Sequence, residues 1–316
     1  MRLGGLEELP GCQDSSRLGA TDVQLFGEIF GAIYLYLDSM AFLFLSAVGL
    51  IIILGMMGIT NLAHGEFMML GAYTAVLATR AGLPFPISVV FASLMVGLFG
   101  MVLERLIIRR FYGNLLQSLV ATWGISLIIS QGMLVLMGPS LQTIRMPLGG
   151  ITVAGKAYAA YRLLLAVIAI GLLIVMWYVF HRTKFGMRAR GAMQNAEIAE
   201  AMGINTSRMY QFTFGIGSAL AGFAGALYAP TTVLAPLYGA SFLAPAFVTV
   251  VVSGGANVIQ GALITSVLLG IIEGTSSRLY GTFIGRMALL AAAMVILRVL
   301  PTGISGYLET RGERAR

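Results

Sequence analysis

Long stretches of apolar residues without a charged side chain dominate the sequence. One of them, Ala41–Ile59, is about 19 residues long, which lets a helix cross the ~30 Å hydrocarbon core of a bilayer. Charged residues make up 10% of the chain, whereas soluble domains carry about 25%. The sequence therefore predicts an all-α protein with several membrane-spanning helices and excludes an ordinary soluble fold.

Two of the apolar segments are too short to cross a bilayer alone. These two, residues 67–79 and 241–253, lie near the start of each half of the chain, with glycine or proline beside them. Short or broken helices at matching places in two halves indicate a solute path at the middle of the membrane. Two interpretations stay open: a pair of related half-repeats, or two unrelated short pieces. The expected segments are 23–37, 41–59, 67–79, 86–103, 115–137, 163–180, 209–229, 241–253, 257–273 and 283–299, which gives roughly eight to ten helices.

Basic residues gather in three places beside these segments: Arg105–Arg110, the loop 181–208 and the C-terminal residues 301–316. Cytoplasmic loops of membrane proteins carry an excess of Lys and Arg, so all three places are expected in the cytoplasm. Four apolar segments precede Arg105. Because an even number of crossings returns the chain to the same side, the N-terminus is expected in the cytoplasm too. The expected organisation is a loose cytoplasmic tail over 1–22, a membrane domain over 23–300 and a basic cytoplasmic tail over 301–316.

The loop 181–208 is the largest polar stretch between apolar segments, and it contains helix signals. Asn195 suits an N-cap, and Gly203 suits the C′ position. Glu197 and Glu200 fall in the first turns, where the helix dipole favours acidic side chains. A short helix over 196–202 is therefore expected, and it favours a docking element over a plain solvated connector. The expected docking residues are Arg188, Arg190, Glu197, Glu200 and Gly203.

Three motifs in order resemble those of one family of transport proteins. They are "NLAHGEFMMLGAY" from Asn61, "EIAEAMGIN" from Glu197, and "AFVTVVVSGGANVIQGALITSVLLGIIEG" from Ala246. The chain resembles, over roughly residues 23–300, the membrane permeases of ATP-binding-cassette importers for branched-chain amino acids and for related urea or short-chain amide systems. In the third motif, Gly254-Gly255-Ala256-Asn257 fills the usual glycine turn in a slightly varied form.

The resemblance implies a permease subunit in a bacterial inner membrane. It implies three kinds of partner: a second permease subunit, a pair of ATPase subunits and a periplasmic binding protein. It leaves open whether the solute is a branched-chain amino acid or urea or a short amide, and whether the permease pair is a homodimer or a heterodimer. An ATP-independent channel or secondary transporter is the competing class. No nucleotide site is expected, because "GITVAGKA" from Gly150 has the P-loop spacing but lacks its Ser or Thr. No cofactor is expected either, and no enzyme activity, because a nucleophile–base pair is missing.

The most polar cluster between apolar segments holds Asn61, His64 and Glu66. One histidine beside one carboxylate lacks the further ligands that a metal site needs. We expect a break between helices here, with Asn61 capping the short helix that follows. Two roles stay open for His64 and Glu66: contact with the solute in its path, or pairing with neighbouring helices to hold the break in shape.

A stripe of small residues follows the 181–208 loop. Gly217, Ala221 and Gly225 fall on one helix face at four-residue spacing, which is typical of close packing between membrane helices. The packing is expected within the chain, with a dimer seam as the alternative. Cys12 is the only cysteine, so the sequence contains no disulfide framework.

Overall fold

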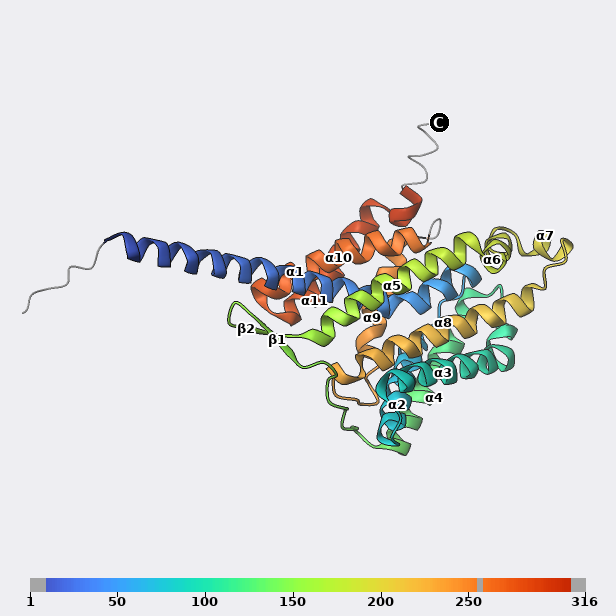
Figure 1. Ribbon diagram of the computed structural model, residues 1–316. Helices are drawn as coiled ribbons and strands as arrows, with labels where there is room; N and C mark the ends of the chain where they lie inside the picture. Colours follow the sequence, from blue (N-terminus) through green and yellow to red (C-terminus); the bar gives the residue numbers. More distant parts are fainter. Residues whose placement is uncertain (1–9, 255–257, 308–316) are drawn as a thin grey trace, which may run out of the picture.

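The computed structural model describes residues 10–254 and 258–307, and they form a helical bundle (Figure 1). Seven helices in these residues are long and apolar enough to cross a membrane. They are α1 (Pro10–Met57), α3 (Phe85–Leu106), α4 (Leu115–Met137), α5 (Ala160–Arg182), α8 (Thr206–Tyr228), α10 (Val258–Tyr280) and α11 (Thr282–Val299). With the shorter α2 (His64–Arg80) and α9 (Ala240–Ser253), they confirm the predicted polytopic α-helical class.

The remaining elements are small and lie in the connections. They are η1 (Ile108–Phe111), β1 (Gly150–Val153), β2 (Lys156–Ala159), α6 (Lys184–Gln194), α7 (Ala196–Ala201) and η2 (Ala229–Thr231). Strands β1 and β2 pair antiparallel, with Val153 opposite Lys156 and a turn at Ala154 and Gly155. The segment with P-loop spacing is therefore a hairpin, whereas a P-loop connects a strand to a helix.

Helix α8 lies at the centre of the bundle, because it packs against α1, α2 and α3. A Cβ on Gly217 would lie 2.5 Å from Cγ1 of Ile53 in α1, and one on Gly225 would collide with the carbonyl oxygen of Met68 in α2. Ala221 is fully buried. The stripe of small residues thus faces the chain's own helices, which approach closely because no side chain separates them.

The outer surface of the bundle is apolar. Helices α3, α4, α5, α10 and α11 expose large side chains such as Leu94, Leu116, Ile128, Val167 and Met294. A soluble protein rarely exposes so many contiguous apolar residues. These faces meet lipid or a neighbouring subunit.

The two ends of the bundle carry different elements. Figure 1 shows the β1–β2 hairpin at one end and α6 and α7 at the other. The start of α1 lies at the hairpin end, because Glu28 pairs with Lys156 at 2.9 Å and Gly27 packs against Ala154. The prediction that the N-terminal part lies on the same side as the 181–208 loop is therefore wrong.

The error came from dividing α1 into two segments, 23–37 and 41–59. Asp38 interrupts the apolar pattern there, but its carboxylate pairs with Arg162 of α5 at 2.5 Å, so the helix continues through it. One crossing fewer reverses the side of the N-terminus. The helix also begins at Pro10, so residues 10–22 are helical and are not a loose tail.

The chain returns to the α6 end after α11. Ile304 and Ser305 are buried, and Gly303 packs against Gly254. Residues 301–307 therefore belong to the folded domain and not to a free tail. The basic residues Arg311, Arg314 and Arg316, and the motif residues Gly255, Ala256 and Asn257, lie outside the described residues.

Candidate functional site

The loop between α5 and α8 contains the expected helix. In α7 the side-chain oxygen of Asn195 accepts from the backbone N–H of Ile198 at 3.0 Å, and Gly203 has a φ of +85°. The N–H of Ile204 donates to the carbonyl of Ala199 at 3.0 Å, which closes the C-terminus as a glycine cap does. The predicted capped helix is confirmed. The preceding helix α6, capped by Thr183, was not predicted.

The five expected docking residues do not all face the same way. Arg188, Glu197 and Glu200 are exposed. Arg190 is half-buried and donates to the carbonyl of Phe180, whereas Glu200 accepts from the hydroxyl of Thr206. Arg190 thus ties α6 back to α5, and Glu200 ties α7 to α8. Gly203 ends α7, so its role is in the shape of the loop.

Sequence reasoning missed the apolar part of this surface. Met187 in α6, Ile198 in α7 and Met202 just beyond it expose 57%, 58% and 77% of their surface. Ile198 and Met202 are four residues apart, which places them on one side of a helical turn. That spacing was visible in the sequence, but the acidic residues around it concealed the pattern. Exposed apolar residues rimmed by charge are typical of a protein interface.

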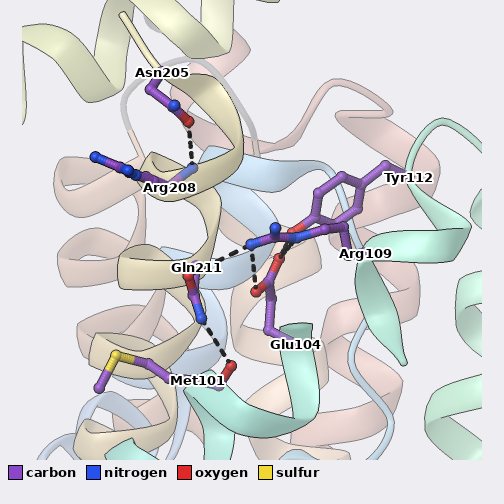
Figure 2. A network of polar contacts seen from close by, with 7 residues as sticks. All are labelled: Met101, Glu104, Arg109, Tyr112, Asn205, Arg208 and Gln211. Atoms are coloured by element: carbon purple, nitrogen blue, oxygen red, sulfur yellow. Dashed lines mark hydrogen bonds and ion pairs between the residues drawn. The ribbon is translucent and has the colours of Figure 1, made fainter. Parts of the chain in front are cut away.

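A buried polar network lies behind the loop and joins α3 to α8 (Figure 2). The carboxylate of Glu104, which is fully buried, accepts from Arg109 Nε at 3.2 Å and from the hydroxyl of Tyr112. Arg109 also donates to Gln211 Oε1 of α8 at 3.4 Å, and Gln211 Nε2 donates to the carbonyl of Met101 at 3.3 Å. The second turn of α8 is therefore fixed to the end of α3.

Two groups in this network have shifted acidities. The hydrogen bond to Glu104 raises the pKa of the Arg109 guanidinium. Burial raises the pKa of Tyr112 well above its ordinary value, and the hydrogen bond to Glu104 adds to that shift. Both groups therefore stay protonated over the physiological range, and the network keeps its hydrogen bonds there.

The start of α8 is fixed as well. The side-chain oxygen of Asn205 accepts from the backbone N–H of Arg208 at 2.9 Å and caps the helix. Asn205 is only two residues beyond Gly203, which ends α7. The end of α7 thus lies next in sequence to a helix whose first turns are capped and tied to α3.

The two short helices begin at one point inside the bundle. The backbones of Gly65, in the first turn of α2, and Gly239, just before α9, touch one another. Helix α2 runs from there towards the hairpin end, and α9 runs towards the α6 end. The predicted breaks at both segments are thus brought together. The N-terminal ends of both helices, which carry the positive ends of their dipoles, converge there.

The polar cluster before α2 is buried in protein. His64 is fully buried, and its Nε2 lies 2.8 Å from the carbonyl oxygen of Ser46 in α1, to which it donates because a carbonyl only accepts. Asn61 is also fully buried, and its Oδ1 accepts from the N–H of Ala63 at 3.1 Å. Asn61 therefore closes a turn before the helix and is not its N-cap, which is Ala63. Glu66 is 6% exposed, with Oε2 unpaired among the described residues.

A second polar site lies nearer the hairpin end and was missed in the sequence. Asp38, Arg162, Glu273 and Arg286 line one cavity of about 230 Å³. The four residues come from α1, α5, α10 and α11. In the sequence, each of the four charged residues lies near or within an apolar segment, so each resembled an isolated charge or a residue at a segment boundary. Only the packing of the four helices brings them together.

Comparison with known proteins places this architecture in a family. The family described as "Branched-chain amino acid transport system / permease component" matches residues 32–300. The chain belongs to this permease family. The match spans the whole membrane bundle, from the middle of α1 to the end of α11.

Similar permeases come from several organisms. The permease is 27% identical to the branched-chain amino acid permease protein BraD of Pseudomonas aeruginosa, covering 84% of this chain and 92% of that one. It is 27% identical to LivH of Escherichia coli K12, covering 84% and 91%. The guanosine permease NupQ of Bacillus subtilis is 26% identical, covering 56% of this chain and 60% of its own. Among solved structures, PsaBC from Streptococcus pneumoniae aligns with a TM-score of 0.44 at 15% identity, covering 84% and 91%.

Proposed function

We propose that this permease forms, with a second permease subunit, the membrane path of an ATP-driven importer for branched-chain amino acids in the bacterial inner membrane. The observation that carries the proposal is the capped helix α7, which stands at one end of the bundle with exposed Ile198 and Met202 beside charged residues. A plain connector between two membrane helices has no need of such a surface. The names of the relatives that match most of the chain support the amino acid class.

The partners follow from the two ends of the bundle. By the charge rule, the basic α6–α7 end faces the cytoplasm, where a pair of ATPase subunits would bind it. The hairpin end would then face outward, where a soluble binding protein would deliver the solute. No step of ATP hydrolysis belongs to this chain in the proposal, and ATP is the substrate of the partner subunits.

Coupling would run from α7 into the bundle. Closure of the ATPase pair would push on α7, which continues through the Asn205 cap into α8. Because Gln211 and Arg109 tie α8 to α3, the push would move these helices together as a rigid body. Such movement needs contacts that differ between the two states of the transporter.

Other solutes remain as alternatives, which the uptake experiment below tests. Urea or a short amide was the second interpretation of the sequence motifs, and nucleoside permeases occur among the relatives over shorter stretches. An ATP-independent channel or secondary transporter is disfavoured by the α7 surface, because neither class needs a docking helix. We rank the branched-chain amino acids first because those relatives cover 84% of the chain.

The experiment is uptake by cells that express the complete transporter. Wild type is expected to take up leucine in an ATP-dependent way and to co-purify with its ATPase. Met202→Asp is expected to weaken that co-purification by about tenfold or more, as loss of an interface anchor does. Ile151→Asp, at an exposed apolar position on the hairpin, is the control and should co-purify normally.

Two results would contradict the proposal. Uptake of urea or guanosine in place of leucine would reject the solute. Normal ATPase co-purification and normal coupling by both Met202→Asp and Gly203→Pro, at wild-type membrane levels, would reject the docking role of α7. Gly203→Pro is included because proline cannot adopt the φ of +85° found there.

A further inference from the structure

The polar cavity near the hairpin end is lined by four ionisable side chains from membrane-spanning helices. Asp38, Arg162, Glu273 and Arg286 line it, and each comes from a different helix. Ionisable residues inside a membrane are costly, and they normally face a cavity or one another where they serve a solute path. The volume of about 230 Å³ is below the roughly 300–1,000 Å³ of drug-sized ligand sites, so the cavity suits a small solute.

We propose that this cavity binds a zwitterionic α-amino acid with an apolar side chain. Arg162 and Arg286 face the carboxylate of the solute, Asp38 and Glu273 face its ammonium group, and an aromatic floor faces its side chain. The inference rests on the proposed import function and adds the residues that would recognise the solute inside the membrane domain.

Arg162 has donors left for a ligand. Its Nη1 donates to Asp38 Oδ2 at 2.5 Å, and among the described residues the carboxylate of Asp38 accepts no second hydrogen bond. A guanidinium has five N–H donors in a planar fork. The Arg162 side chain is 42% exposed and that of Asp38 16%. The ion pair is thus open on the cavity side, where a carboxylate can meet the unused face of the guanidinium.

Glu273 offers the ligand a buried acceptor atom. Its Oε2 is buried and has no hydrogen-bond partner among the described residues, although Arg286 lies within electrostatic range. A buried acceptor left unsatisfied costs free energy, which a ligand donor would recover. An ammonium group, with its N–H donors and positive charge, is the ligand chemistry that satisfies it.

The balance of charge selects the ligand class. Two acidic and two basic side chains line the cavity, so their formal charges balance when all four are ionised. A zwitterion is also neutral overall and presents one group to each sign. An anion or a cation would leave charges of its own sign unmatched, and urea or a nucleoside has no charged group to present to either sign.

The floor of the cavity is aromatic. The ring centroids of Phe42 and Phe242 lie 5.4 Å apart, and those of Phe42 and Tyr228 lie 5.6 Å apart. All three rings line the cavity. An apolar side chain buried against them gains about 25 cal/mol per Å² of surface removed from water. Beneath the floor, Tyr238 contacts Phe242 and leads to Gly239, where α2 and α9 meet.

The first test measures leucine uptake and binding-protein-stimulated ATPase activity in the complete transporter. Asp38→Asn, Arg162→Gln and Glu273→Gln are each expected to lower uptake by about 10-fold to 100-fold, the loss of one charged hydrogen bond, with ATPase activity retained. Lys156→Gln breaks the exposed pair with Glu28 at the same end and serves as the matched control, with uptake unchanged.

A charge exchange separates binding from a structural tie between α1 and α5. Asp38→Arg combined with Arg162→Asp keeps an ion pair but reverses its direction. No restoration of uptake is expected, because the solute would then meet the wrong sign on each side. Restored uptake would show that the pair serves only to join the helices and would overturn the proposal.

The second test reads occupancy directly, so it does not depend on folding of the charge variants. Ser241→Cys, which lines the cavity, is labelled with a small maleimide in a Cys12→Ser background. Leucine at millimolar concentration is expected to slow labelling. Its analogues 4-methylpentanoate, which lacks the ammonium group, and isoamylamine, which lacks the carboxylate, are expected not to. Equal protection by the analogues or by guanosine overturns the zwitterion assignment.

The results of these tests distinguish a failure of the proposed cavity site from a failure of the proposed import function. Leucine uptake by wild type with unchanged uptake in all three charge variants overturns the site and leaves the proposed function standing. Absence of leucine uptake by wild type overturns the function itself.

Discussion

Gly65 and Gly239 touch backbone to backbone, and a Cβ added to either would collide with the carbonyl oxygen of the other. The two glycines begin the two short helices, α2 and α9. Because the colliding atoms are backbone atoms, no side-chain rotation can relieve the overlap. The convergence of these helices thus depends on the absence of two side chains.

Replacement of Gly65 by alanine tests this contact. Gly65→Ala is expected to destabilise the permease by about 1–3 kcal/mol, the usual cost of overpacking. The measurement is the midpoint of thermal unfolding in detergent. Gly132→Ala in α4, where a Cβ meets nothing within 4 Å, is the matched control and should unfold at or above the wild-type temperature. Equal midpoints for both variants would contradict the close contact.

The Glu104 network predicts a pH dependence at alkaline pH. The pKa of Tyr112 is raised from 10.0 by burial and by its hydrogen bond to Glu104. A raised pKa in the folded state gives stability that is complete below the unfolded value and is lost as the pH rises towards the folded value. The unfolding midpoint of wild type should therefore exceed that of Tyr112→Phe by a constant amount up to about pH 10.

Above that pH the difference should shrink. The comparison with Tyr112→Phe removes the contribution of every other titrating group, because both proteins share them. A difference that is constant to pH 12, or that falls already near neutrality, would show that Tyr112 does not hold its proton against Glu104. Tyr112 itself lies in the connection between η1 and α4, outside the membrane-spanning helices.

The end of α1 predicts a labelling pattern. Gln24 and Ala154 are exposed at the hairpin end, and Met202 is exposed at the α7 end. Gln24→Cys and Ala154→Cys, each in a Cys12→Ser background, are expected to react with an impermeant maleimide from the same side of the membrane. Met202→Cys should react only from the opposite side. Reaction of Gln24→Cys and Met202→Cys from one side would restore the original prediction for the N-terminal part.

Uniformly apolar helices were predictable from the sequence, and charged contacts across the fold were not. Segments such as 115–137 and 86–103 appear as α4 and α3 almost at the expected bounds, because apolar length alone decides a membrane helix. Asp38 divided α1 in the prediction because its partner Arg162 is 124 residues away. The residues next to Asp38 in the sequence give no sign that its charge is paired with a distant residue.

The difference between local and distant contacts also explains which residues of the α7 surface and of the polar cavity could be predicted from the sequence. Asn195 and Gly203 act on backbone groups within a few residues, so their roles could be read from local sequence. The cavity charges act through helix packing, and the exposed faces of Ile198 and Met202 depend on where α7 stands. Arg190 and Glu200, both expected on the docking surface, each have a partner in a neighbouring helix, and these contacts were not predictable from the local pattern.

His64 offers a test of structure against solute contact. It is fully buried and donates from Nε2 to Ser46, one helical turn before Gly49, whose added Cβ would lie 3.1 Å from the imidazole. We therefore expect a structural role that joins α2 to α1. His64→Ala should cost about 2–4 kcal/mol, from the lost hydrogen bond and the cavity left behind.

The conservative variant separates the two roles. His64→Gln keeps an N–H donor that can reach the Ser46 carbonyl, so it should recover most of the stability and transport leucine with an unchanged KM. Stability is measured as the unfolding midpoint, and KM from uptake at saturating ATP. If His64→Gln folds normally but raises KM several-fold, the imidazole contacts the solute, and the path passes through the start of α2. If stability and KM both stay at wild-type values in His64→Ala as well, the bond to Ser46 contributes to neither.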